Sequence, residues 1–206
     1  EERTILVWCE KGLERNSLKG PSQNASSIFP KNKIAIISGP NFAAEIAKGL
    51  PAATTVASKH EEISKKIANL IKSPTLRPYL SNDIVGSQIA GALKNIYAIA
   101  SGIVVGKKYG ENAVASIISR SFAEITTVAK SMNAKKSTLA GLSGMGDLFL
   151  TCSSKESRNF SLGIDLAKGK TLNEIIQKKF SIAEGVFTVR ALKKLADKKK
   201  LDLPIN

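Results

Sequence analysis

The spacing of apolar positions along this chain changes near residue 80, and the change predicts two kinds of structure. Before it, short apolar runs alternate with polar connections, which is typical of strands and helices in an α/β sheet. After it, apolar residues recur at helical spacing in longer segments, separated by Gly-rich or polar stretches. We therefore expect an α/β domain over residues 1–80 and a mostly helical domain over residues 81–206.

Short apolar runs and helical spacing predict the individual strands and helices. In the first domain, short apolar runs predict strands at 4–9, 33–38 and 53–57. Helical spacing in the same domain predicts helices at 42–48 and 61–71. In the second domain, it predicts helices at 84–105, 111–132, 157–167, 172–178 and 186–199.

Lys94 lies inside the most apolar stretch of the chain, residues 89–106. Burial disfavours the charged amine, so a lysine held inside a packed helix has a lowered pKa and can exchange protons at neutral pH. A lysine that reaches the surface along its own methylene stem is an equally good interpretation of the spacing alone. A membrane-spanning helix is a weaker third interpretation, because Lys94 and Asn95 interrupt the run near its centre.

Composition narrows the class of protein. The chain has 206 residues, of which 43% are hydrophobic, so it can bury a core and form one or two domains. Its formal charge of +14 favours anionic partners such as phosphorylated metabolites, nucleic acids or acidic lipids. Aromatic residues make up only 5% and are not interleaved with the basic ones, which argues against nucleic-acid binding.

The cysteines and the histidine argue against several chemistries. Cys9 and Cys152 form neither a metal-ligand spacing nor a disulfide framework, which fits a reducing cytoplasm. His60 lies in a polar run at a predicted helix start, which argues against a Ser/His catalytic pair. No signal peptide is visible, and the first residue is not methionine, so we expect the natural start to lie elsewhere.

Two segments directly follow predicted strands. They are Lys11-Gly12 and the run Ser-Gly-Pro-Asn-Phe-Ala at 38–43. Ligands of open parallel sheets bind beyond the carboxyl ends of the strands, where both segments would lie. Gly39 and Pro40 are explained equally well as turn formers.

Two further segments carry candidate chemistry. The glycine loop Gly-Leu-Ser-Gly-Met-Gly-Asp at 141–147 would let the backbone approach a ligand, with Asp147 holding an ammonium or a hydroxyl. A tight helix connector explains the glycines as well, but not a carboxylate beside an apolar run. In Ser157, Arg158 and Asn159, an arginine fork flanked by a hydroxyl and an amide suits phosphate oxygens. Ser and Asn also cap helices.

Six motifs in order carry a resemblance to a known family. They are Lys-Gly at 11–12, Ser-Gly-Pro-x-Phe-Ala-x-Glu at 38–45, Gly-Ala-Leu-Lys-Asn at 91–95, Gly-Leu-x-Gly-x-Gly-Asp-Leu-x-x-Thr-Cys at 141–152, Ser-Arg-Asn at 157–159 and Glu-Gly-Val at 184–186. Together they closely resemble bacterial NAD(P)-dependent glycerol-3-phosphate dehydrogenase, nearly from end to end. The resemblance implies an enzyme that interconverts sn-glycerol 3-phosphate and dihydroxyacetone phosphate with NAD or NADP, supplying glycerol 3-phosphate for phospholipid synthesis.

The resemblance also implies a fold and a set of site residues. The fold is a partial Rossmann-type α/β segment followed by an all-α substrate domain like the C-terminal domain of 6-phosphogluconate dehydrogenase. Lys94 falls on the lysine that serves the family as proton acceptor. The substrate positions are Lys11, Gly39, Asn41, Lys94, Asp147, Ser157, Arg158 and Asn159. The cofactor positions are Lys11, Ala43, Arg158, Ile182 and Glu184.

The chain departs from the family in three ways. Asn41 stands where Ser or Thr is usual, and Gln88 where Glu is common. No G-x-G-x-x-G occurs, so the glycine turn that grips the cofactor pyrophosphate is missing, and we expect a fragment that lacks the front of the nucleotide-binding domain. The alternative is a truncated, inactive remnant that serves only as a helical or dimerising domain. We expect a small phosphorylated substrate, no nucleic acid, no membrane insertion and a homodimer.

Overall fold

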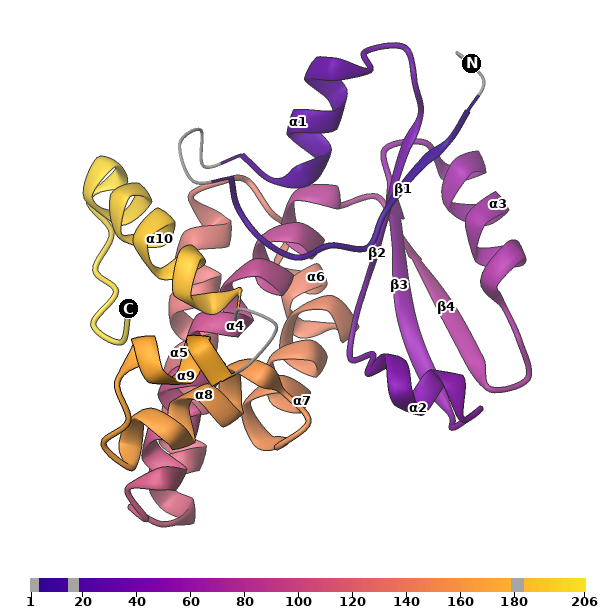
Figure 1. Cartoon of the computed structure of the whole chain (residues 1–206). Coiled ribbons are helices and arrows are strands. Elements are labelled where there is room, and N and C mark those ends of the chain that lie inside the picture. Colours follow the sequence, from indigo (N-terminus) through magenta and orange to yellow (C-terminus); the bar gives the residue numbers. More distant parts are fainter. Residues whose placement is uncertain (1–3, 15–18, 179–183) are drawn as a thin grey trace.

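A four-stranded sheet and a group of helices lie side by side (Figure 1). The structure, a computed structural model, describes residues 4–14, 19–178 and 184–206. The strands are β1 (Leu6–Trp8), β2 (Ile34–Ser38), β3 (Ala52–Ser58) and β4 (Leu76–Ser81), in the sheet order β1-β2-β3-β4.

The sheet belongs to an α/β arrangement, as predicted, but it is mixed and not purely parallel. β1 runs parallel to β2 and β3 parallel to β4, but β2 and β3 are antiparallel. The two strands that matter for the site still end at the same edge, because β1 and β2 share a direction. β4 was not predicted: most of its residues are at least partly exposed on both faces, and it contains Pro78, which suits an edge strand.

Three helices accompany the sheet: α1 (Pro21–Ile28), α2 (Ala43–Ala47) and α3 (Glu61–Ile71). α3 covers one face, because Ile63, Ile67 and Ala68 recur at helical spacing and pack with Ala35 and Val56 of the sheet. α1 was not predicted, since its sequence is almost entirely polar or small.

The polar side chains of α1 tie it to the helical domain. Ser22 Oγ donates a hydrogen bond of 2.5 Å to Oε1 of the buried Gln88. Gln88, one of the departures from the family pattern, therefore lies under α1 and joins the two parts of the chain.

After β4, every described element is helical, which confirms the predicted change of structure. The central helix is α4 (Ile84–Gly106), which runs through the middle of the others in Figure 1. The remaining elements are α5 (Glu111–Lys130), α6 (Lys136–Ala140), the π-helical turn η1 (Leu142–Gly146), α7 (Asp147–Ser153), α8 (Arg158–Ala167), α9 (Leu172–Lys178) and α10 (Gly185–Lys199). The short α6, η1 and α7 were missed, because three glycines interrupt this stretch and residues 141–147 were interpreted as a loop.

The main core surrounds α4. Its Leu93 and Tyr97 are fully buried in a cluster with Ile125 and Val128 of α5 and Leu192 of α10. α4 is long and apolar enough to cross a membrane, but 67% of its most apolar window is buried inside the protein. Its burial is that of a core helix.

Two glycines let α4 and α8 cross closely. A Cβ on Gly102 would lie 2.1 Å from the carbonyl oxygen of Phe160, and one on Gly163 would lie 2.1 Å from that of Ile99. Real Cβ atoms do not approach so closely, so only glycine fits at either position. The crossing fixes Arg158, at the start of α8, relative to Lys94.

The predicted glycine loop at 141–147 is not a loop. It forms the turn η1 and leads without a break into α7. A Cβ on Gly144 would lie 1.9 Å from the carbonyl oxygen of Leu139, so this glycine serves close backbone packing against α6. The connector interpretation therefore explains Gly144, and Asp147 becomes the first residue of α7.

Candidate active site

Lys94 does not reach open surface. Its side chain crosses to α7, where Nζ donates hydrogen bonds of 2.5 Å to Asp147 Oδ1 and 2.9 Å to Thr151 Oγ1. Lys94 is 8% exposed and Asp147 1% exposed. Asp147 and Thr151 face the same amine because they are four residues apart on one helix. The surface-reaching interpretation of Lys94 is therefore wrong.

Lys11 completes the cluster from the sheet side. It follows β1, and its Nζ donates to Asp147 Oδ2 at 2.6 Å and to the carbonyl oxygen of Gly39 at 3.2 Å. The Lys11 side chain lies over Gly91 of α4, where a Cβ would be in van der Waals contact with Lys11 Cγ and Cδ at 3.4 Å. One buried carboxylate thus holds two ammonium groups, one from each part of the chain.

Burial lowers the pKa of Lys94 to about 8. The Asp147 carboxylate opposes this shift by stabilising the charged amine, and the nearby Lys11 charge adds to it. An amine with a pKa near 8 is present in both protonation states close to neutral pH. This is the property that an acid/base group requires.

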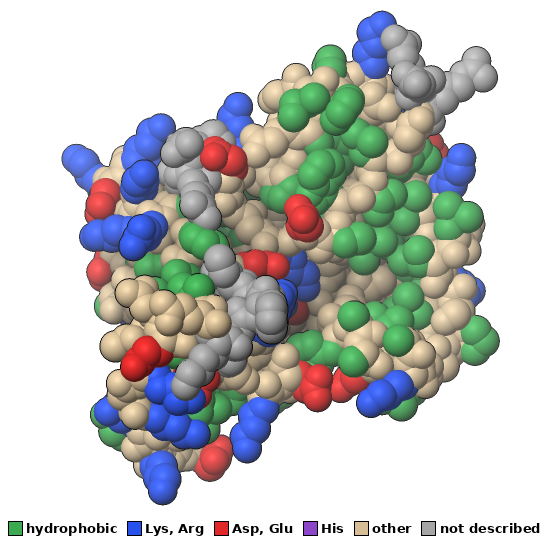
Figure 2. All heavy atoms as spheres, viewed as in Figure 1, with side chains coloured by type: hydrophobic (Ala, Val, Ile, Leu, Met, Phe, Trp, Pro, Cys, Tyr) green, Lys and Arg blue, Asp and Glu red, His purple; other side chains and the backbone are tan. Residues whose placement is uncertain are grey.

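These groups open into a cleft of about 380 Å³ between the helices and the sheet. Acidic and basic side chains gather in a hollow between the two parts in Figure 2. The lining includes the predicted site residues Lys11, Asn41, Lys94, Asp147, Ser157, Arg158, Asn159 and Glu184. Residues predicted from six separate motifs are therefore brought to one place, apart from the exceptions below.

The segment 157–159 combines capping with cleft lining. Ser157 caps α8 by accepting a hydrogen bond from the Phe160 amide at 3.3 Å, and Asn159 Oδ1 accepts from the Gly185 amide at 3.0 Å. The bond from the Phe160 amide confirms the capping interpretation for Ser157, and both side chains are buried. Arg158 is different: it is exposed at the cleft, with its guanidinium 3.7 Å from Glu184 Oε1. It is the group of this segment most available to an anion.

The positions after β2 contribute less than expected. The side-chain amide of Asn41 donates to the carbonyl oxygens of Pro40 and Ala53, both at 3.0 Å, so it braces the turn that it lines. Gly39 offers its carbonyl to Lys11. Ala43 is the first residue of α2 and is exposed. It is not among the described residues that line the cleft, whereas its neighbour Phe42 is.

A second groove of about 620 Å³ adjoins the cleft beyond the end of β1. Glu10, Lys11 and Glu184 line both spaces, and Trp8 and Phe187 line the second one alone. Two predicted cofactor positions, Lys11 and Glu184, thus lie on the shared wall. Ile182, another predicted position, lies outside the described residues.

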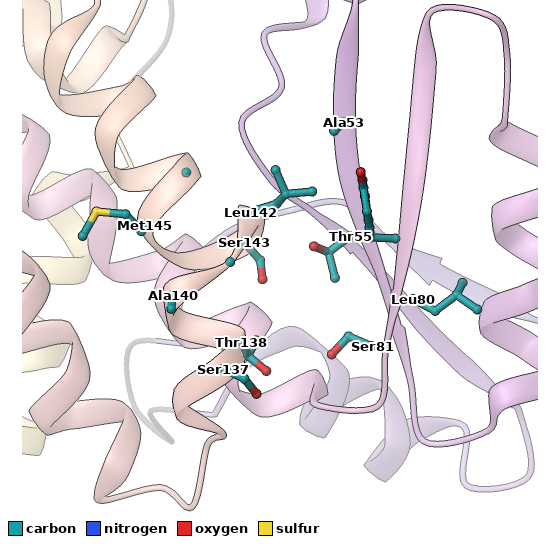
Figure 3. A pocket seen from close by; sticks show the side chains of 13 residues that line it. Ala53, Thr55, Leu80, Ser81, Ser137, Thr138, Ala140, Leu142, Ser143 and Met145 are labelled. Atoms are coloured by element: carbon teal, nitrogen blue, oxygen red, sulfur yellow. The ribbon is translucent and has the colours of Figure 1, made fainter.

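A larger groove of about 740 Å³ is separate from this chemistry. It lies between the sheet and the segment from α6 to η1, where Thr55 and Ser81 face Thr138 and Ser143 (Figure 3). None of its described lining residues carries a charge at neutral pH. The smaller, charged cleft is therefore the better candidate for acid/base chemistry.

Two residues of the cleft were missed as site residues from the sequence. Thr151 binds Lys94, and the side-chain amide of Asn95 donates to Glu184 Oε2 at 2.9 Å. Thr151 could have been found from its i+4 spacing to Asp147. Asn95 directly follows Lys94, but nothing in the sequence indicates that the two side chains reach one cleft.

Two family profiles match the chain. The profile described as NAD-dependent glycerol-3-phosphate dehydrogenase C-terminus matches residues 83–206, and the corresponding N-terminus profile matches residues 1–64. Glycerol-3-phosphate dehydrogenase (NAD(P)+) of Caulobacter vibrioides is 48% identical over 200 residues, which cover 97% of this chain and 60% of that protein. The Ehrlichia chaffeensis protein of the same name is 45% identical over 206 residues, covering 99% and 63%.

A solved structure agrees. Glycerol-3-phosphate dehydrogenase from Coxiella burnetii superposes with a TM-score of 0.94 at 34% identity, over 98% of this chain and 62% of that one. The Saccharomyces cerevisiae enzyme, at 24% identity and a TM-score of 0.88, shares the fold. The chain thus spans about 60% of the length of the curated relatives it matches.

Proposed function

Because the chain belongs to the NAD-dependent glycerol-3-phosphate dehydrogenase family, we propose that it carries the acid/base and phosphate-binding part of such an enzyme. The reaction is the interconversion of sn-glycerol 3-phosphate and dihydroxyacetone phosphate. The observation that carries the proposal is the buried Lys94–Asp147 pair in a cleft that also presents Arg158. The proton-transfer group and the phosphate-binding group therefore share one small space.

Lys94 is the proposed proton acceptor for the substrate hydroxyl. In the oxidation, the C2 hydroxyl proton passes to the neutral Lys94 Nζ while the C2 hydrogen leaves with its electron pair, producing a ketone. Asp147 stabilises the ammonium that forms, and burial favours return of the proton, so the group works in both directions. Thr151 Oγ1 accepts a hydrogen bond from Lys94, which fixes the direction of the amine.

Arg158 is the proposed anchor for the substrate phosphate. A guanidinium makes directed, charge-assisted hydrogen bonds to phosphate oxygens, which suits an exposed side chain at the mouth of the cleft. Lys11, Gly39, Asn41, Ser157 and Asn159 complete the proposed substrate set. Binding at the phosphate, remote from C2, orients the reacting carbon toward Lys94.

NAD or NADP supplies the hydride acceptor of this family. The groove beyond β1 adjoins the cleft and is lined by Trp8, Lys11 and Glu184, which fits the part of a dinucleotide that must lie beside the substrate. The 206-residue sequence contains no G-x-G-x-x-G turn to hold a pyrophosphate. We therefore expect this chain alone to bind NADH weakly, and fluorescence titration measures that affinity.

The remaining parts of the proposal concern context. We propose the division into residues 1–80 and 81–206, a cytoplasmic location, a homodimer and a contribution to phospholipid synthesis. The family relationship supports the pathway, and the reduced state expected for Cys9 and Cys152 supports the compartment.

Calorimetric titration of glycerol 3-phosphate into the chain tests the proposal. Arg158→Ala should weaken binding by about tenfold or more, since a charge-assisted bond to phosphate is lost. Lys107→Ala, which removes an exposed lysine at the end of α4, should leave the affinity unchanged. An inactive helical remnant predicts no binding that depends on Arg158, and that result would refute the proposal.

A further inference from the structure

Arg158, the proposed phosphate anchor, already lies beside a carboxylate of this chain, that of Glu184. Glu184 Oε1 lies 3.7 Å from Arg158 Nη2, and Glu184 Oε2 accepts a 2.9 Å hydrogen bond from the Asn95 side-chain amide. One carboxylate thus contacts the amide next to Lys94 and the guanidinium at the mouth of the cleft. These donors present to Glu184 the kind of surface that would bind a phosphate.

The protein backbone fixes Glu184 in this place. Gly185, the next residue, donates its amide to the buried Asn159 side chain at 3.0 Å. A Cβ on Gly185 would lie 2.6 Å from the carbonyl oxygen of Asn95, so the start of α10 is pressed against α4. The backbone at Glu184 is therefore held beside the cleft, and its half-exposed side chain lies within reach of Arg158.

The balance of charges in the cleft determines how the contact between Arg158 and Glu184 affects anion binding. Its described lining residues include four carboxylates, from Glu10, Asp147, Glu156 and Glu184, and three cations, from Lys11, Lys94 and Arg158. Asp147 is already shared between the two lysines, which leaves Arg158 as the cation for an incoming anion. A phosphate dianion bound to Arg158 would lie close to the Glu184 carboxylate, and the two negative charges would repel each other.

We propose that Glu184 is a resident anion that occupies the phosphate position on Arg158 and Asn95 in the free protein and must be displaced by the substrate. This inference rests on the proposed function. Displacement releases the carboxylate toward the adjoining groove, whose wall Glu184 also lines. Because Arg158 and Glu184 are 57% and 45% exposed, water screens the pair and the competition is modest.

Inorganic phosphate titrated into the whole chain, followed by calorimetry, measures this competition. Glu184→Gln keeps the shape and the acceptor for Asn95 but removes the charge, so phosphate should bind about three- to fivefold more tightly than in the unchanged chain. Glu156→Gln is the matched control, because it removes one charge from the same cleft without a described contact to Arg158. Glu184→Asp keeps the charge on a shorter side chain and should give a smaller gain. Circular dichroism verifies that each variant is folded.

The outcomes separate the inference from the function on which it rests. Tighter phosphate binding in Glu184→Gln than in Glu156→Gln supports the inference. Equal or weaker binding in Glu184→Gln overturns it, because Glu184 would then position Arg158 rather than compete for it. An equal gain in both variants also overturns it, since the effect would be one of general charge. If the unchanged chain and Arg158→Ala bind phosphate alike, the proposed function itself fails.

Discussion

Replacing Asp147 by Asn tests the electrostatics of the site in isolation. The change removes the carboxylate that contacts both Lys94 and Lys11, while the side chain keeps its size. In the unchanged protein, burial lowers the pKa of Lys94 to about 8, and Asp147 prevents it from falling further. Asp147→Asn should therefore lower the pKa of Lys94 further, below its value in the unchanged protein.

The size of this effect follows from the geometry. An opposite charge within a few ångströms shifts a pKa by about 1–3 units, and the Lys94–Asp147 contact is 2.5 Å. The pKa of Lys94 should thus move from about 8 to roughly 5–7, a change of about 1.4–4 kcal/mol in favour of the neutral amine. Lys94 would then be largely uncharged at pH 7.5.

The assay is an NMR titration of the chain after ¹³C-dimethylation of its lysines, with Lys94 assigned by substitution. Thr151→Val is the matched control, because it removes a neutral partner of the same amine and should move the pKa less. If the pKa of Lys94 is unchanged or higher in Asp147→Asn, the account of how Asp147 tunes this lysine is wrong.

Three further predictions concern stability and thiol reactivity. The pKa of Lys94 is lowered from 10.5 to about 8, so between these pH values the unfolded chain binds more protons than the folded one. Lys94 alone should therefore add about 3 kcal/mol to the unfolding free energy as the pH rises through that window. Denaturant titrations should show this increase for the unchanged chain and not for Lys94→Met. Gly102→Ala should lower the unfolding free energy by at least about 1–3 kcal/mol, because its Cβ would meet the Phe160 carbonyl. In the control Gly141→Ala the new Cβ has no neighbour closer than 3.5 Å, so the unfolding free energy should change by no more than about 0.5 kcal/mol. Equal losses in the two variants would refute the close crossing of α4 and α8. Burial raises the pKa of Cys152 to about 12, so an aromatic disulfide reagent should label the exposed Cys9 in the folded chain and Cys152 only after unfolding, and rapid labelling of both would contradict this.

Much of the fold could be predicted because its long elements carry strong periods. α3 lies at the predicted residues, and α4 ends one residue later than expected. The seven-residue α9 also lies where it was predicted, between polar breaks. The missed elements are short or polar, such as α1, whose place depends on tertiary contacts like Ser22 to Gln88. The antiparallel pairing of β2 and β3 was beyond reach for the same reason, since strand direction is a property of the assembled sheet.

The site divides along similar lines. The apolar surroundings of Lys94 indicated a perturbed lysine, and the structure brings it to Asp147. Whether the lysine reached the surface could not be decided from spacing, because that depends on where α7 lies. The contacts of Glu184 with Asn95 and Arg158 had no sequence signal, since the starts of α8 and α10 meet the middle of α4 there.

The turnover of Lys94→Ala tests most directly whether Lys94 is the proton acceptor. A chimera in which this chain replaces the 200 matched residues of the Caulobacter vibrioides relative provides a protein of full length. NADH oxidation by dihydroxyacetone phosphate is then measured for the chimera, for Lys94→Ala and for the control Lys107→Ala. We expect Lys94→Ala to lower kcat by about a hundredfold or more with little change in KM, and Lys107→Ala to have no effect. Near-normal turnover in Lys94→Ala, or none in the unmodified chimera, would contradict it.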